Sequence, residues 1–145
     1  MKRSRRIGVV ESMAEREERE ERRLMAQSQQ SLELALGRLE ELRAYRQSYA
    51  AEERPKSGTT ALQWQDYHRF MQRLEHAVSA QEQIVAEGQS QREAHQKRWM
   101  AKRQRLESLS RIVDRFQKQE ADDEQRRQQK QQDELALRGG YSVHD

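Results

Sequence analysis

The sequence predicts an all-α protein, a long antiparallel two-helix coiled-coil hairpin in which the second helix is longer than the first. Three observations predict this fold. Residues recur at the spacing of a coiled-coil seam, hydrophobic residues make up only 33% of the chain against 37% charged, and the helical pattern breaks at a single place. A compact domain needs a larger apolar share, whereas paired long helices bury only a seam. Disorder is the alternative from composition, and the sustained seam argues against it.

The first predicted helix covers residues at about 9–53, where apolar side chains recur at helical spacing. Its stripe consists of Leu24, Leu32, Ala35, Leu39, Leu42, Tyr45 and Tyr49. No proline interrupts this stretch. We therefore expect one continuous helix up to the break.

The break is a turn at residues of about 54–60, because Pro55, Ser57 and Gly58 all disfavour a continuing helix. Thr60 and Gln63 follow, three residues apart, which is the spacing of a capping box. The helical pattern restarts directly after them. A loop this short makes its two helices antiparallel neighbours, so we expect residues 1–145 to form a single coiled-coil unit.

The second predicted helix covers residues at about 61–138 and ends before the Gly139, Gly140 pair. Its seam positions alternate between spacings of four and three residues, as a coiled coil requires. They are Tyr67, Met71, Leu74, Val78, Gln81, Val85, Gly88, Arg92, His95, Trp99, Lys102, Leu106, Leu109, Val113, Phe116 and Glu120. The seam is apolar at both ends and polar in its middle.

Folding the chain about Ser57 and Gly58 predicts which residues face one another. The expected pairs are Leu42 with Leu74, Leu32 with Ile84, Ser28 with Gly88, Val10 with Leu106, and Ile7 with Leu109. In this register small residues meet small ones and large residues meet large ones. The first helix then ends before the second. Ile112, Val113, Phe116 and the tail at residues 118–138 are expected to lack an intramolecular partner.

Charge and composition argue against several classes of function. The net charge is only +3, and a basic run at residues 97–105 falls opposite a glutamate-rich run at residues 11–20, so we expect no binding of nucleic acid. The basic and apolar start of the chain is too short for a signal peptide, and no apolar run has membrane-spanning length. The absence of cysteine fits a reducing compartment. We expect a cytoplasmic protein.

Aromatic residues gather around the turn. Five of the eight, Tyr45, Tyr49, Trp64, Tyr67 and Phe70, lie within it or within its flanking helical turns. They can simply close a fraying end of the hairpin. Two helices cannot bury five rings, however, and exposed clustered aromatic side chains mark protein-docking surfaces. Leu42, Leu74 and Ala77 extend the same surface.

The sequence contains no pattern typical of a catalytic site. The four histidines have no metal-ligand spacing, and there is neither a glycine-rich phosphate loop nor a nucleophile elbow. We therefore expect no enzyme, no cofactor and no metal.

The chain resembles the flagellar FliJ family along its whole length. Ser4, Arg6, Val10 and residues 13–16 are similar to that family's opening. LEELRAYRQSY at residues 39–49 and WQDYHRFMQRLE at residues 64–75 resemble the end of its first helix and the start of its second. Arg98, Trp99, Lys102, Arg105 and Leu106 resemble a later segment, and RRQQKQQDELALR at residues 126–138 is similar to its ending.

The resemblance implies a non-enzymatic stalk of the flagellar type III export apparatus, a protein of flagellum biogenesis, motility and chemotaxis. Members bind the export ATPase hexamer, the cytoplasmic domain of the export gate protein and the export chaperones. They associate peripherally with the inner face of the cytoplasmic membrane through the apparatus, and a monomer is expected outside it. The family's gate-contacting face matches Leu42, Tyr45, Tyr49, Phe70, Leu74 and Ala77, with Arg38 and Gln81 beside it.

The predicted overhang of the second helix suggests a role for its apolar residues. Leu109, Ile112, Val113 and Phe116 are expected to meet the ATPase ring. Three alternatives stay open at this point. They are the stalk of a virulence injectisome, a generic coiled-coil scaffold that dimerises through extended helices, and a helical nucleic-acid-binding protein.

Overall fold

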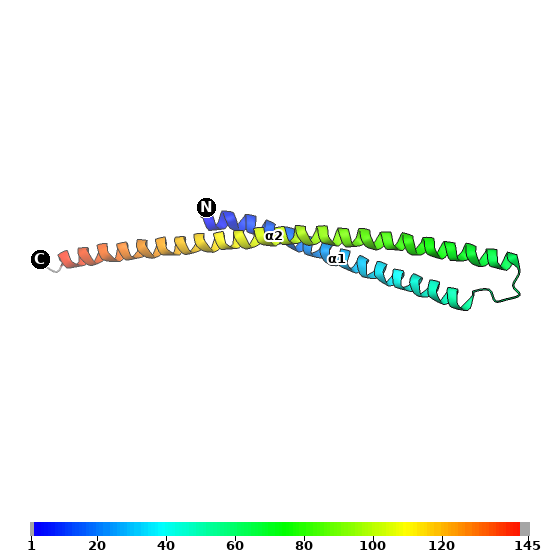
Figure 1. The fold of residues 1–145 in the computed structure, drawn as a ribbon. Helices are drawn as coiled ribbons and strands as arrows, with labels where there is room; N and C mark the ends of the chain where they lie inside the picture. The colour runs from blue at the N-terminus through cyan, green and yellow to red at the C-terminus, as the bar shows by residue number, and fades with distance from the viewer. Residues whose placement is uncertain (1, 143–145) are drawn as a thin grey trace. The chain divides into compact units, whose positions relative to one another are not determined.

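Two long helices make up the fold. The computed structural model describes residues 2–142, with the side chains of residues 2–140, and these residues contain helix α1 (Arg3–Glu52) and helix α2 (Ala61–Ser142) without any strand (Figure 1). The prediction of an all-α hairpin with a longer second helix is confirmed. Helix α1 begins at Arg3, ahead of the position near Val9 expected from the sequence. Arginines favour helix here, and Ser4 is held by a residue of α2, as described below.

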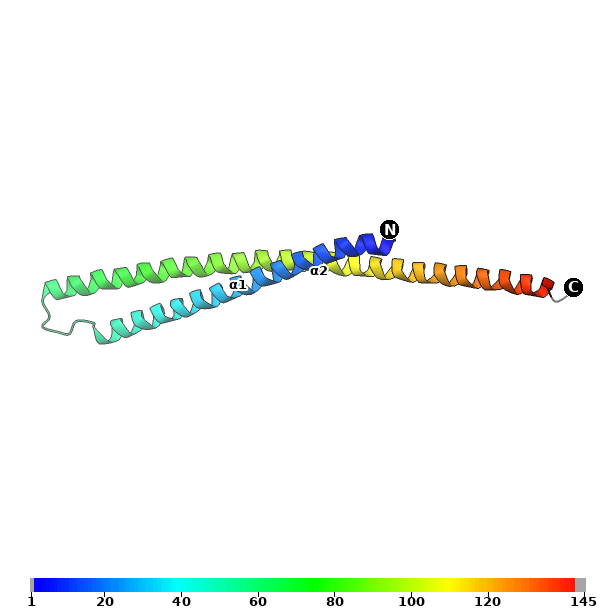
Figure 2. The same cartoon turned by 180° about the vertical axis from the view of Figure 1, so that it is seen from behind.

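The helices form two compact units, each built from antiparallel segments of α1 and α2. The loop unit is Arg19–Met100, and the terminal unit combines the described residues of Met1–Glu18 and Ala101–Asp145. In the loop unit, the two helices are joined by the loop that follows α1, as both ribbon views show (Figures 1 and 2). Because α2 runs through both units, the chain continues from one to the other as helix.

The loop between the helices has the conformation that its residues predict. Gly58 has a φ of 90°, a backbone conformation that residues with a side chain rarely adopt. Thr60 N–H donates to Gln63 Oε1 at 3.1 Å, and Gln63 N–H donates to Thr60 Oγ1 at 3.3 Å. These are the two reciprocal bonds of a capping box, so that prediction is confirmed. The Thr59 hydroxyl donates to the carbonyl of Lys56 and closes the turn before the cap.

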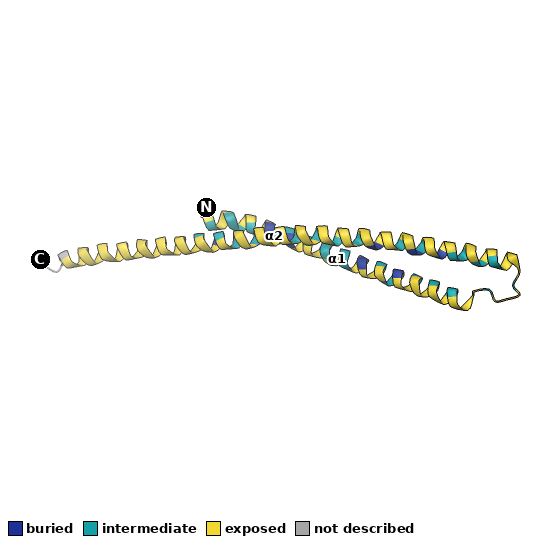
Figure 3. Ribbon diagram, in the orientation of Figure 1, coloured by how far each residue is buried: buried dark blue, intermediate teal, exposed yellow. Residues whose placement is uncertain are grey.

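A cluster of buried apolar residues lies in the loop unit. Leu32, Leu39, Val78 and Val85 form one buried cluster, with Ala35 and Leu42 packed against it. Buried and intermediate residues recur along α1 and along α2 up to Glu120, and exposed residues cover the rest (Figure 3). The side chain of Gln81 also donates from Nε2 to the carbonyl of Ala35 at 2.9 Å, which ties the two helices together across the seam.

The pairing in the loop unit differs from the predicted register in two respects. Leu32 joins a cluster with Val85, whereas Ile84, its expected neighbour, is 50% exposed. Gly88 packs against Leu32, where Ser28 was the expected neighbour, since a Cβ added to Gly88 would lie 3.3 Å from Leu32 Cδ1. A large side chain thus fills the space that glycine leaves, which is how knobs enter holes in coiled coils.

The terminal unit has a sparser core. Ala14, Val113 and Glu18 are its buried residues. Ser4 Oγ donates to Glu120 Oε2 at 2.6 Å, and Ser4 N–H donates to Glu120 Oε1 at 3.2 Å, so α1 extends along α2 as far as Glu120. The prediction that Val113 lacks an intramolecular partner is therefore wrong, because the N-terminal part of α1 covers it. Ile112 and Phe116 are half-buried.

Helix α2 continues beyond its partner. Every side chain at residues 121–140 is exposed, and Arg127 pairs at 3.5 Å with Glu124 of the same helix. The tail at residues 118–138 was predicted to lack a partner within the chain. This prediction is wrong for Glu120, which accepts a hydrogen bond from Ser4. It is confirmed for residues 121–138, whose side chains are all exposed.

Candidate docking surfaces

The loop patch consists of the six residues predicted to meet the export gate: Leu42, Tyr45, Tyr49, Phe70, Leu74 and Ala77. The structure brings its three rings together from both helices. The Phe70 ring lies 4.4 Å from that of Tyr49 and 6.2 Å from that of Tyr45, centroid to centroid. Tyr45 and Tyr49, one turn apart on α1, are 6.4 Å apart. The antiparallel pairing thus builds one aromatic cluster out of residues distant in sequence.

The residues of the loop patch differ in how far they are exposed to solvent. Leu74 is only 6% exposed, so it supports the rings from within the seam. Leu42, Tyr49, Phe70 and Ala77 are half-buried. Tyr45 is 51% exposed, although it touches both other rings. A partner that docks here meets the Tyr45 ring first, and removing Tyr45 disturbs the fold least.

Further rings continue the cluster toward the loop. Tyr67 stacks on Tyr49 at 5.6 Å with an interplanar angle of 11°. Trp64 meets Tyr67 edge-on at 6.2 Å and lies nearly parallel to the ring of His68 at 5.8 Å. Sequence analysis found Trp64 and Tyr67 but left out His68. The spacing of four residues between Trp64 and His68, which places both on one helix face, was the available signal.

Tyr49 is the most enclosed hydroxyl-bearing ring of the loop patch. Burial among the neighbouring rings raises the pKa of its phenol above the ordinary value of 10.0, and the carboxylate of Glu53 raises it further. Both causes disfavour the phenolate. Tyr49 therefore presents a neutral hydroxyl at physiological pH.

The terminal patch consists of the four residues predicted to meet the export ATPase: Leu109, Ile112, Val113 and Phe116. Val113 is 7% exposed and faces the seam. Leu109, Ile112 and Phe116 are half-buried. The four are close on α2, but only the outer parts of three remain accessible to a partner.

Ion pairs connect the two helices of the terminal unit beside this patch. Lys102 Nζ donates to Glu17 Oε2 at 3.0 Å, and Arg105 lies 3.6 Å from the same oxygen. The hydrogen bond from Lys102 is the main cause that lowers the pKa of Glu17. The pKa of Glu120 is also lowered, first by the hydrogen bond from the Ser4 side chain. The predicted pairing of the basic run with the glutamates of α1 is thus observed for Lys102 and Arg105.

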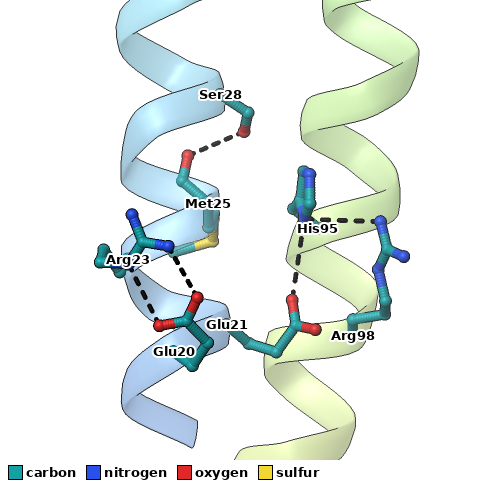
Figure 4. Close-up of polar contacts among 7 residues, drawn as sticks. All are labelled: Glu20, Glu21, Arg23, Met25, Ser28, His95 and Arg98. Atoms are coloured by element: carbon teal, nitrogen blue, oxygen red, sulfur yellow. Dashed lines mark hydrogen bonds and ion pairs between the residues drawn. The ribbon is translucent and has the colours of Figure 1, made fainter. Parts of the chain in front are cut away.

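The polar middle of the seam lies within the loop unit, where Figure 4 shows its contacts. His95 Nδ1 accepts from Arg98 at 3.4 Å and lies 3.7 Å from Glu21 Oε2. That carboxylate oxygen is buried without a hydrogen bond. Arg92 reaches Gln29 across the seam at 3.2 Å. This stretch has polar side chains where the loop unit's core has apolar ones, so it contributes less to pairing.

The described residues offer no site for metal chemistry and no membrane span. Nowhere among them do three or more histidines or carboxylates gather in a way that could hold a metal ion. None of the described helical segments is both long and apolar enough to cross a membrane.

Comparison with known proteins gives one clear result. The sequence matches the family model described as "Flagellar FliJ protein" over residues 3–142. This range includes both helices, the loop patch and the terminal patch. No curated protein matches the chain.

Proposed function

The chain belongs to the flagellar FliJ family, a family related to flagellar protein export, and we propose that it is a non-enzymatic stalk of the export apparatus. In this proposal the loop patch binds the cytoplasmic domain of the export gate. The terminal patch binds the export ATPase ring. The match to a flagellar family model favours this proposal over the injectisome stalk and the generic scaffold.

The aromatic cluster of the loop patch is the single observation that carries the proposal. A two-helix pair needs few rings to close its end, yet here Tyr45 stands 51% exposed while it packs on Tyr49 and Phe70. Rigid rings that keep part of their area in solvent contribute most to binding energy in protein interfaces. The patch is therefore suited to a protein partner.

The terminal patch gives weaker support for ATPase binding. Three of its residues keep exposed area beside the fully exposed helical tail at residues 121–140. The exposed side chains along these turns are accessible to another protein. Val113 is buried, so it supports the patch without contacting the ring.

The rest of the proposal follows from the family. The chain works in the cytoplasm, attaches to the inner face of the membrane only through the apparatus, and engages export chaperones. It is a monomer before it assembles. In this proposal the chain binds the export ATPase and the export gate as a stalk and catalyses no reaction.

Calorimetric titration into the purified gate domain and, separately, into the purified ATPase tests the proposal. Tyr45→Ala should weaken gate binding at least about tenfold and leave ATPase binding unchanged. Leu36→Ala is the matched control, because Leu36 is an exposed apolar residue of the same helix outside the patch. An Ile112→Ser, Phe116→Ser double variant should weaken only ATPase binding, with the exposed Ile84→Ser as its control.

Three possible results distinguish the proposed stalk function from its alternatives. Wild-type binding to both partners, with separate losses in the two variants, supports the proposal. Wild-type binding to neither partner refutes it. Light scattering that shows a dimer of extended chains would favour the scaffold alternative.

A further inference from the structure

Two parallel rows of residues define one face of the terminal unit. Each row has alternating spacings of three and four residues, so its members lie on one side of their helix. The row on α1 is Arg3, Arg6, Val10, Met13 and Glu17. The row on α2 is Arg105, Ser108, Ile112, Arg115 and Gln119. We name these two rows the arginine face.

An ion pair shows that the two rows lie on the same side of the helix pair. Arg105 Nη1 lies 3.6 Å from Glu17 Oε2. Because the helices run antiparallel, the remaining positions match in reverse order. Val10 therefore comes level with Ile112, and Arg6 with Arg115. The face has apolar side chains at its centre, Arg3, Arg6 and Arg115 at one end, and the ion pair of Arg105 and Glu17 at the other.

The arginine face is exposed and carries a net positive charge. Arg3, Arg6 and Arg115 are exposed, and Met13 is 57% exposed. Glu17 is the only acidic residue in the two rows. Its carboxylate already accepts from Lys102 at 3.0 Å and pairs with Arg105. Arg3, Arg6 and Arg115 thus remain exposed on this face.

We propose that the arginine face binds discrete carboxylate groups on an acidic protein surface. This inference rests on the proposed function, which assigns that acidic surface to the export ATPase ring. All the cations that line the rows are arginines, whose planar forks match carboxylates with two parallel hydrogen bonds. Val10, Met13 and Ile112 supply an apolar centre, while the three arginines at one end set orientation and attraction.

The acidic residues beyond the face favour a protein over a uniformly anionic partner. Asp122, Asp123 and Glu124 are exposed on the next turn of α2, and Asp122 continues the row after Gln119. An anionic bilayer or a nucleic acid would repel these three carboxylates wherever it contacted the face. A protein surface can place its own carboxylates against the arginines and leave the three acidic residues in solvent.

Charge reversal in matched pairs tests the inference with the full-length chain. Arg3→Glu, Arg6→Glu changes two arginines of the face. Arg5→Glu, Arg111→Glu makes the same change of charge at two exposed arginines outside both rows. Circular dichroism melts first establish that both variants keep the fold. Each is then titrated into the ATPase at several salt concentrations, and also against polyglutamate and phosphatidylglycerol vesicles.

The face variant should bind the ATPase at least about tenfold more weakly and with a shallower salt dependence, while the control pair changes Kd by less than about threefold. Equal losses in the two pairs, or vesicle binding that the face variant alone abolishes, would overturn the inference. If wild type does not bind the ATPase but binds polyglutamate through the face, the proposed ATPase role fails and the carboxylate-binding face stands.

Discussion

Replacing Gly88 by alanine tests the closest approach of the two helices. In an exposed helix interior, glycine-to-alanine substitution stabilises by about 1 kcal/mol, because alanine loses less backbone entropy. At Gly37 nothing lies within 4 Å of an added Cβ, so Gly37→Ala should show this gain in full. At Gly88 the added Cβ would lie 3.3 Å from Leu32 Cδ1 and 3.9 Å from the Leu32 Cα.

Leu32 has little freedom to move away from a new methyl group. It is 4% exposed and belongs to the buried cluster of the loop unit. Overpacking of such a site costs about 1–3 kcal/mol, which cancels or exceeds the helical gain. We therefore expect Gly88→Ala to range from neutral to about 2 kcal/mol destabilising, so that it falls below Gly37→Ala by at least about 1 kcal/mol.

Urea unfolding followed by far-ultraviolet circular dichroism measures the difference between the two variants. Gly8→Ala serves as a second reference, since a Cβ there also meets nothing within 4 Å. If Gly88→Ala stabilised the chain as much as Gly37→Ala does, Leu32 would not pack against Gly88 in solution. The register assigned to the loop unit would then be wrong.

Three further perturbations have expected outcomes. Thr60→Ala should destabilise by about 1 kcal/mol in urea unfolding, because it removes one half of the capping box; no loss would mean that the box does not form in solution. Val78→Ala should cost about 2 kcal/mol, while the half-exposed Val9→Ala should cost almost nothing by the same assay, and equal losses would contradict the buried seam. Hydrogen bonds lower the pKa of Glu17 and Glu120, so the stability they contribute is complete above the ordinary value of 4.5 and is lost as pH falls through the lowered values. Thermal melts of wild type and a Glu17→Gln, Glu120→Gln variant between neutral and acidic pH should show a smaller pH dependence in the variant, and identical slopes would refute this assignment.

The sequence predicted those features that depend on local spacing. The period of Leu74, Val78 and Val85 identified the seam, because a helix repeats its faces regardless of what lies opposite. Thr60 and Gln63 identified the cap, because their hydrogen bonds connect residues three apart. The aromatic cluster followed from the antiparallel fold that a short loop imposes.

The register could not be predicted equally well. The rule that small residues face small ones placed Ser28 opposite Gly88, whereas packing a seam requires a large side chain to fill the space beside glycine. The reach of α1 along α2 depends on the bond from Ser4 to Glu120, two polar residues that no apolar period marks. Val113 was expected to bind a partner protein, but it is buried where α1 extends along α2. The exposure of Val113 therefore depends on how far α1 reaches along α2.

The chemistry of the two proposed surfaces leads to a distinction in how they respond to salt. The loop patch consists of rings and aliphatic side chains, with Tyr45 as its exposed member, so hydrophobic burial should dominate gate binding. Binding through the arginine face of the terminal unit depends on attraction between charges. Salt weakens this attraction, with a screening length of about 10 Å at moderate ionic strength. Raising the salt concentration should consequently release the ATPase while the gate domain stays bound to the same chain. Parallel titrations in low and high salt would show this, and an equal salt response of both partners would mean that charge, and not the aromatic cluster, governs the contact with the gate.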